Sequence, residues 1–193
     1  MTKEYKVLKK RIDEIEGNIL KLLKSCKTNT SSSYQDLVKS YILLVHAELE
    51  NYIEAICQGI ISKSKELYDS KQRITKPILS LATMSEKIFK EEDQQYDTTK
   101  KRLDKLFSNY NAILANNNGI KEKDLEKLLP IIGIEMYEVD DTLLSQLNAF
   151  GKTRGQIAHK TTKIIRDYKN EQEVVAALLI NLLDLDKKFE TLK

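Results

Sequence analysis

The sequence predicts an all-α fold, and three observations support this prediction. Glycine, proline and tryptophan are scarce, at 6, 2 and 0 residues in a chain of 193. Leucine, isoleucine, lysine and glutamate are abundant, as in helical proteins. Apolar residues recur at three- and four-residue steps along much of the chain. Together these features predict a helical bundle with additional short helices between its core helices.

The N-terminal part of the chain predicts two helices. Residues 3–24 place an apolar face on one helix, formed by Tyr5, Leu8, Ile12, Ile15, Ile19 and Leu23. The polar stretch 25–33 then forms a turn, and its last serines can cap the next helix. That long helix is predicted over 34–68. Its centre is apolar over a wide arc, which is typical of the buried spine of a bundle.

Shorter elements are predicted next. Residues 69–77 break the long helix, and Pro77 is suited to begin a short helix that runs through Phe89. A further amphipathic helix is predicted over 98–115, and the run "NNNG" at 116–119 ends it.

The C-terminal part returns to long helices. A short helical segment at 121–129 is closed by Pro130 and Gly133, and Asp140 or Asp141 is suited to cap a helix that begins near Thr142. Residues 160–170 are predicted to be a polar connection, and 171–191 the last helix. These elements form one domain over 1–193. Its core comes from about 34–68 and 140–191, with an elaboration over about 70–135.

Composition excludes several classes of protein. The longest apolar run, "VVAALLINLL" at 174–183, is too short to span a membrane, and the charged N-terminus does not resemble a signal peptide. We therefore expect a cytoplasmic protein without a membrane partner. Cys26 and Cys57 form no metal-ligand spacing, and no glycine-rich phosphate loop is present. We expect no metal and no cofactor.

The net charge of +3 is mild, and charges of both signs alternate along the chain. This balance permits nucleic-acid binding without requiring it.

One arginine lies on the apolar face of its predicted helix. Around that helix an apolar arc of roughly 140° is formed by Leu143, Leu147, Phe150, Gly151, Ile157 and Ala158. Arg154 falls near the centre of this arc. A guanidinium keeps its charge, so burying it without a partner costs several kcal/mol. Either Glu48 or Glu50 forms an internal ion pair with it, or this face opens onto a polar cleft or a subunit interface.

The two histidines suggest different roles. On an unbroken helix His159 lies roughly 140° around the axis from Arg154, and the two converge only if the helix ends or loosens near Gly155. His159 alone is also suited to cap a helix C-terminus. His46 has apolar neighbours and is interpreted as a packing residue.

The stretch "RGQIAHK" has the form Arg-x4-His, which resembles the signature of the HEPN superfamily (higher eukaryotes and prokaryotes nucleotide-binding domains). The upstream "LLSQLNAFGKT" and the helix "SYILLVHAELENYIEAI" at 40–56 are also similar to that family. In its ribonuclease-like stand-alone branch, a Glu followed by an aromatic residue occurs in the long helix. Glu50-Asn51-Tyr52 matches that pattern.

The resemblance implies a metal-independent endoribonuclease that acts on single-stranded RNA as a homodimer. Arg154 would stabilise the phosphorane, and His159 would act as the general base or acid. By family analogy the protein would be a toxin of a toxin–antitoxin pair or a phage-defence effector. Gly155 departs from the pattern, because active members commonly carry a polar residue there.

A second hypothesis is a catalytically inactive module that binds RNA or protein. Under either hypothesis an antitoxin-like or regulatory protein is an expected partner. The candidate RNA-contacting residues are Lys152, Lys160, Lys100, Lys101 and Arg102.

Overall fold

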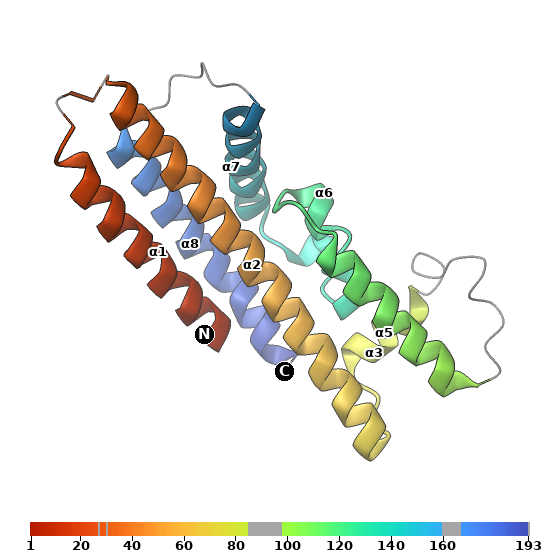
Figure 1. Cartoon of the computed structure of the whole chain (residues 1–193). Coiled ribbons are helices and arrows are strands. Elements are labelled where there is room, and N and C mark those ends of the chain that lie inside the picture. The colour runs from red at the N-terminus through yellow and green to blue at the C-terminus, as the bar shows by residue number, and fades with distance from the viewer. Residues whose placement is uncertain (27, 30, 85–97, 160–166, 193) are drawn as a thin grey trace.

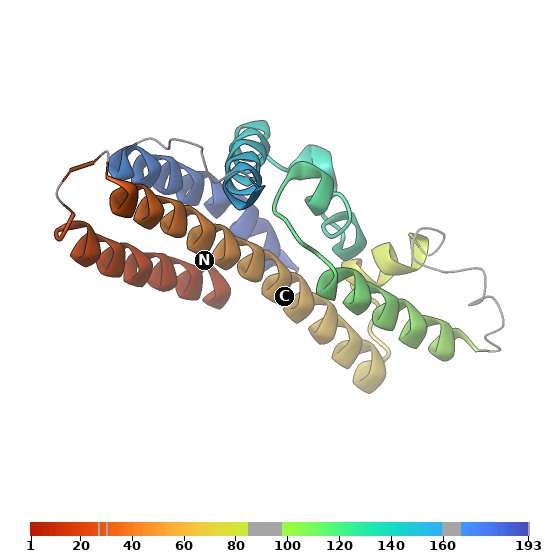
Figure 2. The same ribbon diagram turned by 45° about the horizontal axis from the view of Figure 1, so that its top comes forward.

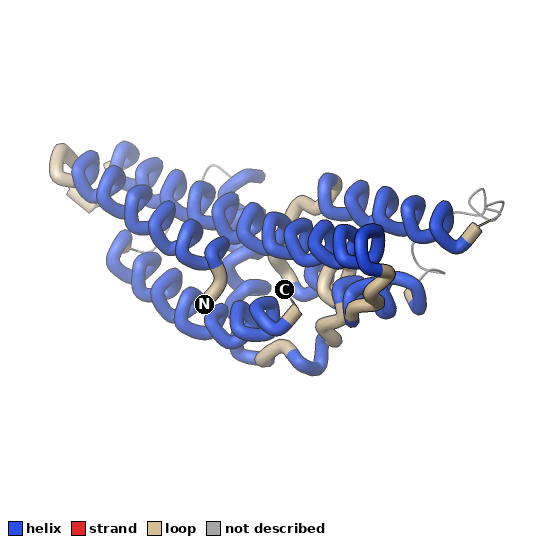
Figure 3. The backbone as a smooth tube through the Cα atoms, turned by 90° about the horizontal axis from the view of Figure 1, so that it is seen from below, coloured by secondary structure: helices blue, strands red, loops and turns tan. Residues whose placement is uncertain are grey.

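The computed structural model describes residues 1–26, 28–29, 31–84, 98–159 and 167–192. Within these residues the chain forms helices and connecting segments without any strand (Figure 3). The α-helices are α1 (Lys3–Leu23), α2 (Ser32–Lys71), α3 (Lys76–Thr83), α5 (Thr99–Ala115), α6 (Glu122–Leu125), α7 (Asp141–His159) and α8 (Tyr168–Thr191). Two short 3-10 turns, η2 (Pro130–Ile132) and η3 (Met136–Glu138), precede α7. The all-α prediction is confirmed.

Helix α2 runs the full length of the molecule, and the other elements pack around it (Figure 1). Helices α1 and α8 lie along its N-terminal part. Helix α7 packs against both α2 and α8, and α3 and α5 pack against the C-terminal part of α2. Figure 2 shows α7 crossing the layer that α1, α2 and α8 form. The predicted buried spine is therefore α2.

The burial pattern explains why α2 is central. Its buried apolar residues cover a wide arc: Tyr34, Val38, Tyr41, Ile42, Val45, Leu49, Tyr52, Ile53, Ile56, Cys57, Ile60 and Ile61. An arc this wide needs more than one neighbour to exclude water from it. Helix α1 covers part of it with five buried residues, Tyr5, Leu8, Ile12, Ile15 and Ile19. Thus α1 belongs to the core, although we predicted a core of three later helices.

A buried carboxylate ties α1, α2 and α8 together. Asp186 on α8 is fully buried and accepts hydrogen bonds from the backbone N–H of Thr2, at 2.8 Å, and from the Thr2 hydroxyl. The Tyr52 hydroxyl on α2 donates a third bond at 2.8 Å. These donors replace the water that Asp186 loses on burial.

The start of α8 corrects the prediction that 160–170 is a connection. Helix α8 already begins at Tyr168, whereas residues 160–166 lie outside the described part of the chain. The Tyr34 hydroxyl of α2 accepts a hydrogen bond from the Tyr168 N–H at 3.1 Å and donates to Asp167. A side chain distant in sequence therefore caps this helix, which no local pattern could reveal.

The remaining boundaries agree closely with the sequence. Helix α5 ends at Ala115, immediately before the "NNNG" run, and Asp140 caps α7 by accepting from the Leu143 N–H at 3.0 Å. Helix α3 ends at Thr83, and the rest of the helix predicted through Phe89 lies outside the described residues. Gly133 closes the η2 turn with φ +91°, a conformation that favours glycine.

No helix in the described ranges combines the length and the apolar character needed to cross a membrane.

We predict that Asp186→Ala strongly destabilises the fold. It leaves three buried donors of Thr2 and Tyr52 without an acceptor, and each unsatisfied buried group costs about 1–3 kcal/mol. Urea unfolding followed by circular dichroism should show a loss of more than about 2 kcal/mol. Asp184→Ala is the matched control on the same helix, because Asp184 is exposed and pairs only with Lys187 among the described residues. Equal effects of the two substitutions would contradict the role of Asp186.

Candidate active site

Helix α7 carries both residues of the Arg-x4-His motif. It is continuous from Asp141 to His159, so it does not end or loosen at Gly155 as convergence of the pair would require. Arg154 and His159 therefore start from positions roughly 140° apart around the helix axis. His159 is the last residue of α7, and its side chain lies outside the described part of the structure.

The apolar arc of α7 faces the core, and Arg154, near the centre of that arc, is half-buried. Leu143, Leu147, Phe150, Gly151 and Ile157 are buried as expected, whereas Ala158 is exposed. Arg154 lies within electrostatic range of His46 and Glu50 on α2. We call Arg154, His46, Glu50, Lys121 and Asp124 the arginine cluster.

His46 is almost completely enclosed in this cluster. Its side chain is 3% exposed, and its ring stacks on Phe150 with centroids 6.3 Å apart and planes inclined by 14°. Its Nδ1 lies 3.5 Å from a carboxylate oxygen of Glu50. Burial, followed by the positive charge of Arg154, lowers the pKa of His46 to about 4. The ring is therefore neutral at pH 7, which agrees with its interpretation as a packing residue.

Burial and nearby charges of both signs act in opposite directions on the pKa of Glu50. Burial and the nearby negative charge of Glu54 raise the pKa of its carboxyl, and Arg154 acts in the opposite direction. Its side chain is only 17% exposed. Burial has the largest effect, so the pKa of this carboxyl lies above its ordinary value.

The two predicted ion-pair partners of Arg154 behave differently. Glu48 points to the other side of α2 and pairs with Arg11 of α1 at 3.2 Å, so it does not neutralise Arg154. Glu50 is near enough to interact with Arg154 electrostatically, without a direct ion pair between them among the described residues.

Helix α6 and the residue before it complete the cluster with residues that the sequence analysis did not single out. Lys121 and Asp124 both influence the pKa of His46. Asp124 accepts a hydrogen bond from the Lys121 N–H at 3.1 Å. The amide of Asn148 on α7 accepts from the Glu122 N–H and donates to the Glu122 carboxylate, at 3.0 and 3.1 Å. These bonds hold α6 against α7.

Gly151 permits this close approach. A Cβ atom at Gly151 would lie 2.9 Å from Cγ of Lys121, closer than side chains tolerate. In the sequence, Gly151 lies inside an amphipathic helix, one turn before Arg154. A glycine in such a position indicates that another segment packs closely across the helix. Gly155 differs, because a Cβ there would meet nothing within 4 Å. The position after Arg154 therefore has open space around it.

The candidate RNA-contacting residues are dispersed. Lys152 is exposed on α7, close to Arg154 in sequence. Lys100, Lys101 and Arg102 are exposed on the first turn of α5, at the end of the molecule remote from the C-terminus of α7 (Figure 1). Lys160 lies outside the described residues. The structure therefore does not bring the α5 residues next to Arg154.

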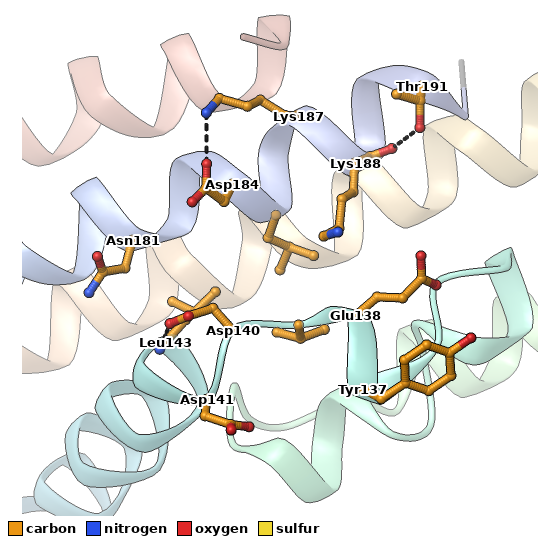
Figure 4. Close-up of a pocket in the computed structure, with 12 residues that line it drawn as sticks. Tyr137, Glu138, Asp140, Asp141, Leu143, Asn181, Asp184, Lys187, Lys188 and Thr191 are labelled. Carbon is orange, nitrogen blue, oxygen red and sulfur yellow. Dashed lines mark hydrogen bonds and ion pairs between the residues drawn. The ribbon is translucent and has the colours of Figure 1, made fainter.

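A cleft of about 780 Å³ lies at the opposite end of α7, between its first turn, η3 and α8 (Figure 4). Asp140, Asp141 and Leu143 contribute to its lining. At 1.5 Å per residue, Arg154 lies roughly 15–20 Å further along the helix, so this cleft is separate from the arginine cluster. Within the described ranges, no three His, Cys, Asp or Glu side chains are grouped so as to hold a metal ion.

The sequence matches a known protein family. The family model of RiboL-PSP-HEPN matches residues 6–190, which include the whole arginine cluster. No curated protein and no solved structure matches the chain.

We predict that His46 makes stability sensitive to mild acid. The pKa of His46 is lowered from 6.5 to about 4 in the folded state. Its contribution to the free energy of unfolding is therefore complete above pH 6.5 and is lost as the pH falls toward 4. This difference in pKa corresponds to about 3 kcal/mol of unfolding free energy. The raised pKa of Glu50 offsets part of the loss at low pH. Urea unfolding at pH 7 and pH 4.5 should show a larger loss for the wild type than for His46→Gln. Equal losses of stability in the wild type and in His46→Gln would contradict a buried, neutral ring at His46.

We predict opposite effects of alanine at two glycines. Gly155→Ala should stabilise the protein by about 0.5–1 kcal/mol, because a helix interior disfavours glycine and space is available. Gly133→Ala should destabilise it by more than about 1 kcal/mol, because φ is +91° there and a Cβ would lie 3.0 Å from Lys76 and Ser80. Thermal unfolding measures both. Destabilisation by Gly155→Ala would show that Gly155 is needed for the local structure.

Proposed function

The chain belongs to the RiboL-PSP-HEPN family, and from this membership we propose that it is an endoribonuclease that cleaves single-stranded RNA without a metal ion. The family supports a HEPN-type ribonuclease or RNA-binding module in general. The specific proposal is a composite site, in which Arg154 and His159 from each of two copies act on one phosphate.

The position of Arg154 carries this proposal. Its guanidinium is half-buried beside a polar cluster, without a direct ion pair to Glu50 among the described residues. A cation held in this way is available to an anionic ligand. The planar donor fork of arginine suits the extra negative charge that develops on a phosphorane during RNA cleavage.

His159 supplies the proton transfer in the proposed reaction. A ring that titrates near neutrality can remove the proton from the ribose 2′-hydroxyl, and a second ring can protonate the leaving 5′-oxygen. His46 does not suit either role, because it is buried and its pKa is about 4. The second ring is therefore assigned to His159 of another copy. The products would be a 2′,3′-cyclic phosphate and a 5′-hydroxyl end.

Gly155 favours a second candidate function. Active relatives commonly carry a polar residue after the arginine, and here that position offers open space without a side chain. A catalytically inactive module that binds RNA or a regulatory protein would tolerate this loss. The ribonuclease is proposed to act in the cytoplasm, as a toxin or phage-defence effector under the control of an antitoxin-like partner.

We predict that purified protein cleaves a mixed-sequence single-stranded RNA in the presence of EDTA. His159→Ala should reduce the rate by about 100-fold or more, because a general acid–base group is lost. Arg154→Lys keeps the charge without the donor fork and should reduce the rate by about the same factor. Gel electrophoresis, with enzymatic analysis of the 3′ ends, measures rate and product.

Thr153→Ala is the matched control, since the Thr153 hydroxyl only donates to the backbone oxygen of Ala149 among the described residues. Equal cleavage by the wild type and His159→Ala would identify a contaminating nuclease and refute the role of His159. If none of the proteins cleaves RNA, Gly155→Asn separates the two candidate functions. Cleavage restored by Gly155→Asn would attribute the loss to the missing side chain, and its continued absence would favour the binding module.

A further inference from the structure

The side chain of Lys121 lies across α7 at the turn that precedes Arg154. A Cβ atom added at Gly151 would lie 2.9 Å from Cγ of Lys121 and 3.0 Å from its Cε. The aliphatic chain of the lysine therefore packs along the backbone of α7, and only its ammonium group extends beyond this contact. Arg154 follows Gly151 by three residues, which places it on the same face of the helix. The two cations consequently belong to one surface.

The backbone of Lys121 is fixed where α6 begins. Its N–H donates to the Asp124 carboxylate at 3.1 Å, and its carbonyl accepts from the N–H groups of Asp124 and Leu125 at 2.8 and 3.0 Å. The two bonds between Asn148 and Glu122 join this turn to α7, and the two helices lie side by side in Figure 1. Because the backbone and most of the side chain are held, binding a ligand at the ammonium costs little conformational entropy.

The ring of His46 shows that the two cations converge. Burial has the largest effect in lowering the pKa of this ring, Arg154 and Lys121 lower it further, and Asp124 acts in the opposite direction. A charge influences a ring in this way only when it lies near it. One of these cations comes from α7 and the other from the segment before α6, so the tertiary structure brings them together.

The two carboxylates of the arginine cluster have other partners. Asp124 accepts from the backbone N–H of Lys121, and Glu50 lies 3.5 Å from Nδ1 of His46. The Asp124 and Glu50 side chains are only 13% and 17% exposed, which leaves little of their charge at the surface. Within the described part of the chain, neither carboxylate forms a direct ion pair with Lys121 or Arg154. Two like charges are thus held near each other, and an anion would stabilise this arrangement.

We propose that Lys121 binds a backbone phosphate of the RNA substrate, next to the phosphate on which Arg154 acts. This proposal deepens the proposed function and rests on it for the choice of RNA as the ligand. Lys121 crosses α7 about 4.5 Å along the helix axis from Arg154, so it meets a neighbouring phosphate instead of the one that reacts. Its ammonium binds phosphate as a point charge, whereas the guanidinium of Arg154 offers a planar fork.

The charge of a neighbouring phosphate does not change during cleavage. A cation bound to it therefore stabilises the bound substrate and the transition state equally. Lys121 should consequently contribute to the affinity for RNA and not to the rate of the chemical step. This difference distinguishes Lys121 from Arg154, whose proposed partner gains negative charge during the reaction.

Binding of an RNA that cannot be cleaved tests the proposal separately from catalysis. The probe is a mixed-sequence single-stranded 2′-O-methyl RNA, which lacks the nucleophilic hydroxyl, and fluorescence anisotropy measures its Kd. Lys121→Met keeps the aliphatic chain over Gly151 without the charge and should weaken binding about 10-fold, as the loss of one charge-assisted hydrogen bond predicts. Lys121→Arg keeps the charge and should bind within about 3-fold of the wild type. Lys123→Met, exposed on α6, is the matched control and should change Kd by less than about 2-fold.

Salt dependence and a glycine substitution test the geometry. Loss of one phosphate contact should lower the steepness of log binding constant against log salt by about 0.7, in Lys121→Met and not in Lys123→Met. Gly151→Ala introduces a Cβ where the Lys121 chain lies, so it should displace the ammonium and weaken binding without changing any charge. Gly17→Ala is its control, because a Cβ there meets nothing within 4 Å. Should circular dichroism show that Gly151→Ala unfolds the protein, the two Lys121 variants decide the question alone.

The outcomes separate the Lys121 site from the ribonuclease. Equal Kd values for the wild type and Lys121→Met, equal losses in Lys121→Met and Lys123→Met, or a wild type that does not bind the probe would overturn the proposal. With cleavable RNA, Lys121→Met should raise KM about 10-fold at unchanged kcat, and a loss confined to kcat would also overturn it. Cleavage that does not depend on Lys121 would leave the ribonuclease standing. Binding that requires Lys121, in a protein that cleaves no RNA, would refute the ribonuclease and retain the phosphate site.

Discussion

The wide apolar arc of α2 is the constraint on which the rest of the structure depends. A 40-residue helix with apolar residues over so much of its circumference cannot be stable alone, and it needs a neighbour along each buried sector. Helices α1 and α8 fill the sectors along its N-terminal part, α7 fills the next one, and α3 and α5 fill the sector at its C-terminal part. A polar residue on the buried arc, such as His46, is consequently enclosed by a second element.

The arginine cluster results from this enclosure. His46 and Glu50 lie where α7 crosses α2, so burial changes the protonation of both groups in directions that reduce charge. The positive charge of Arg154 then favours a neutral ring at His46 and an ionised carboxyl at Glu50. Beside Arg154 there are thus a neutral ring and a carboxyl whose pKa is raised. Lys121 and Asp124 add one further charge of each sign next to His46.

Sequence reasoning succeeded where local pattern decides the structure. Periodicity located α1, α2, α5 and α7, and the Asp140 cap and the "NNNG" run marked ends of helices correctly. It also identified Arg154 as a charge among apolar neighbours. It failed where distant segments meet. Nothing near Glu48 in sequence indicates that Arg11 is its partner, and nothing near Tyr168 indicates that Tyr34 caps the helix there. The contribution of Lys121 depends on a segment that packs across Gly151, so only the tertiary structure reveals it.

The bond from Thr2 to Asp186 spans 184 residues and has a consequence for biosynthesis. Helix α8 leaves the ribosome after every other described helix, and until then the sector of α2 that it covers is exposed to solvent. Contacts so distant in sequence form late in folding. Until α8 has been synthesised, the apolar sector of α2 that it covers is therefore open to aggregation with other chains.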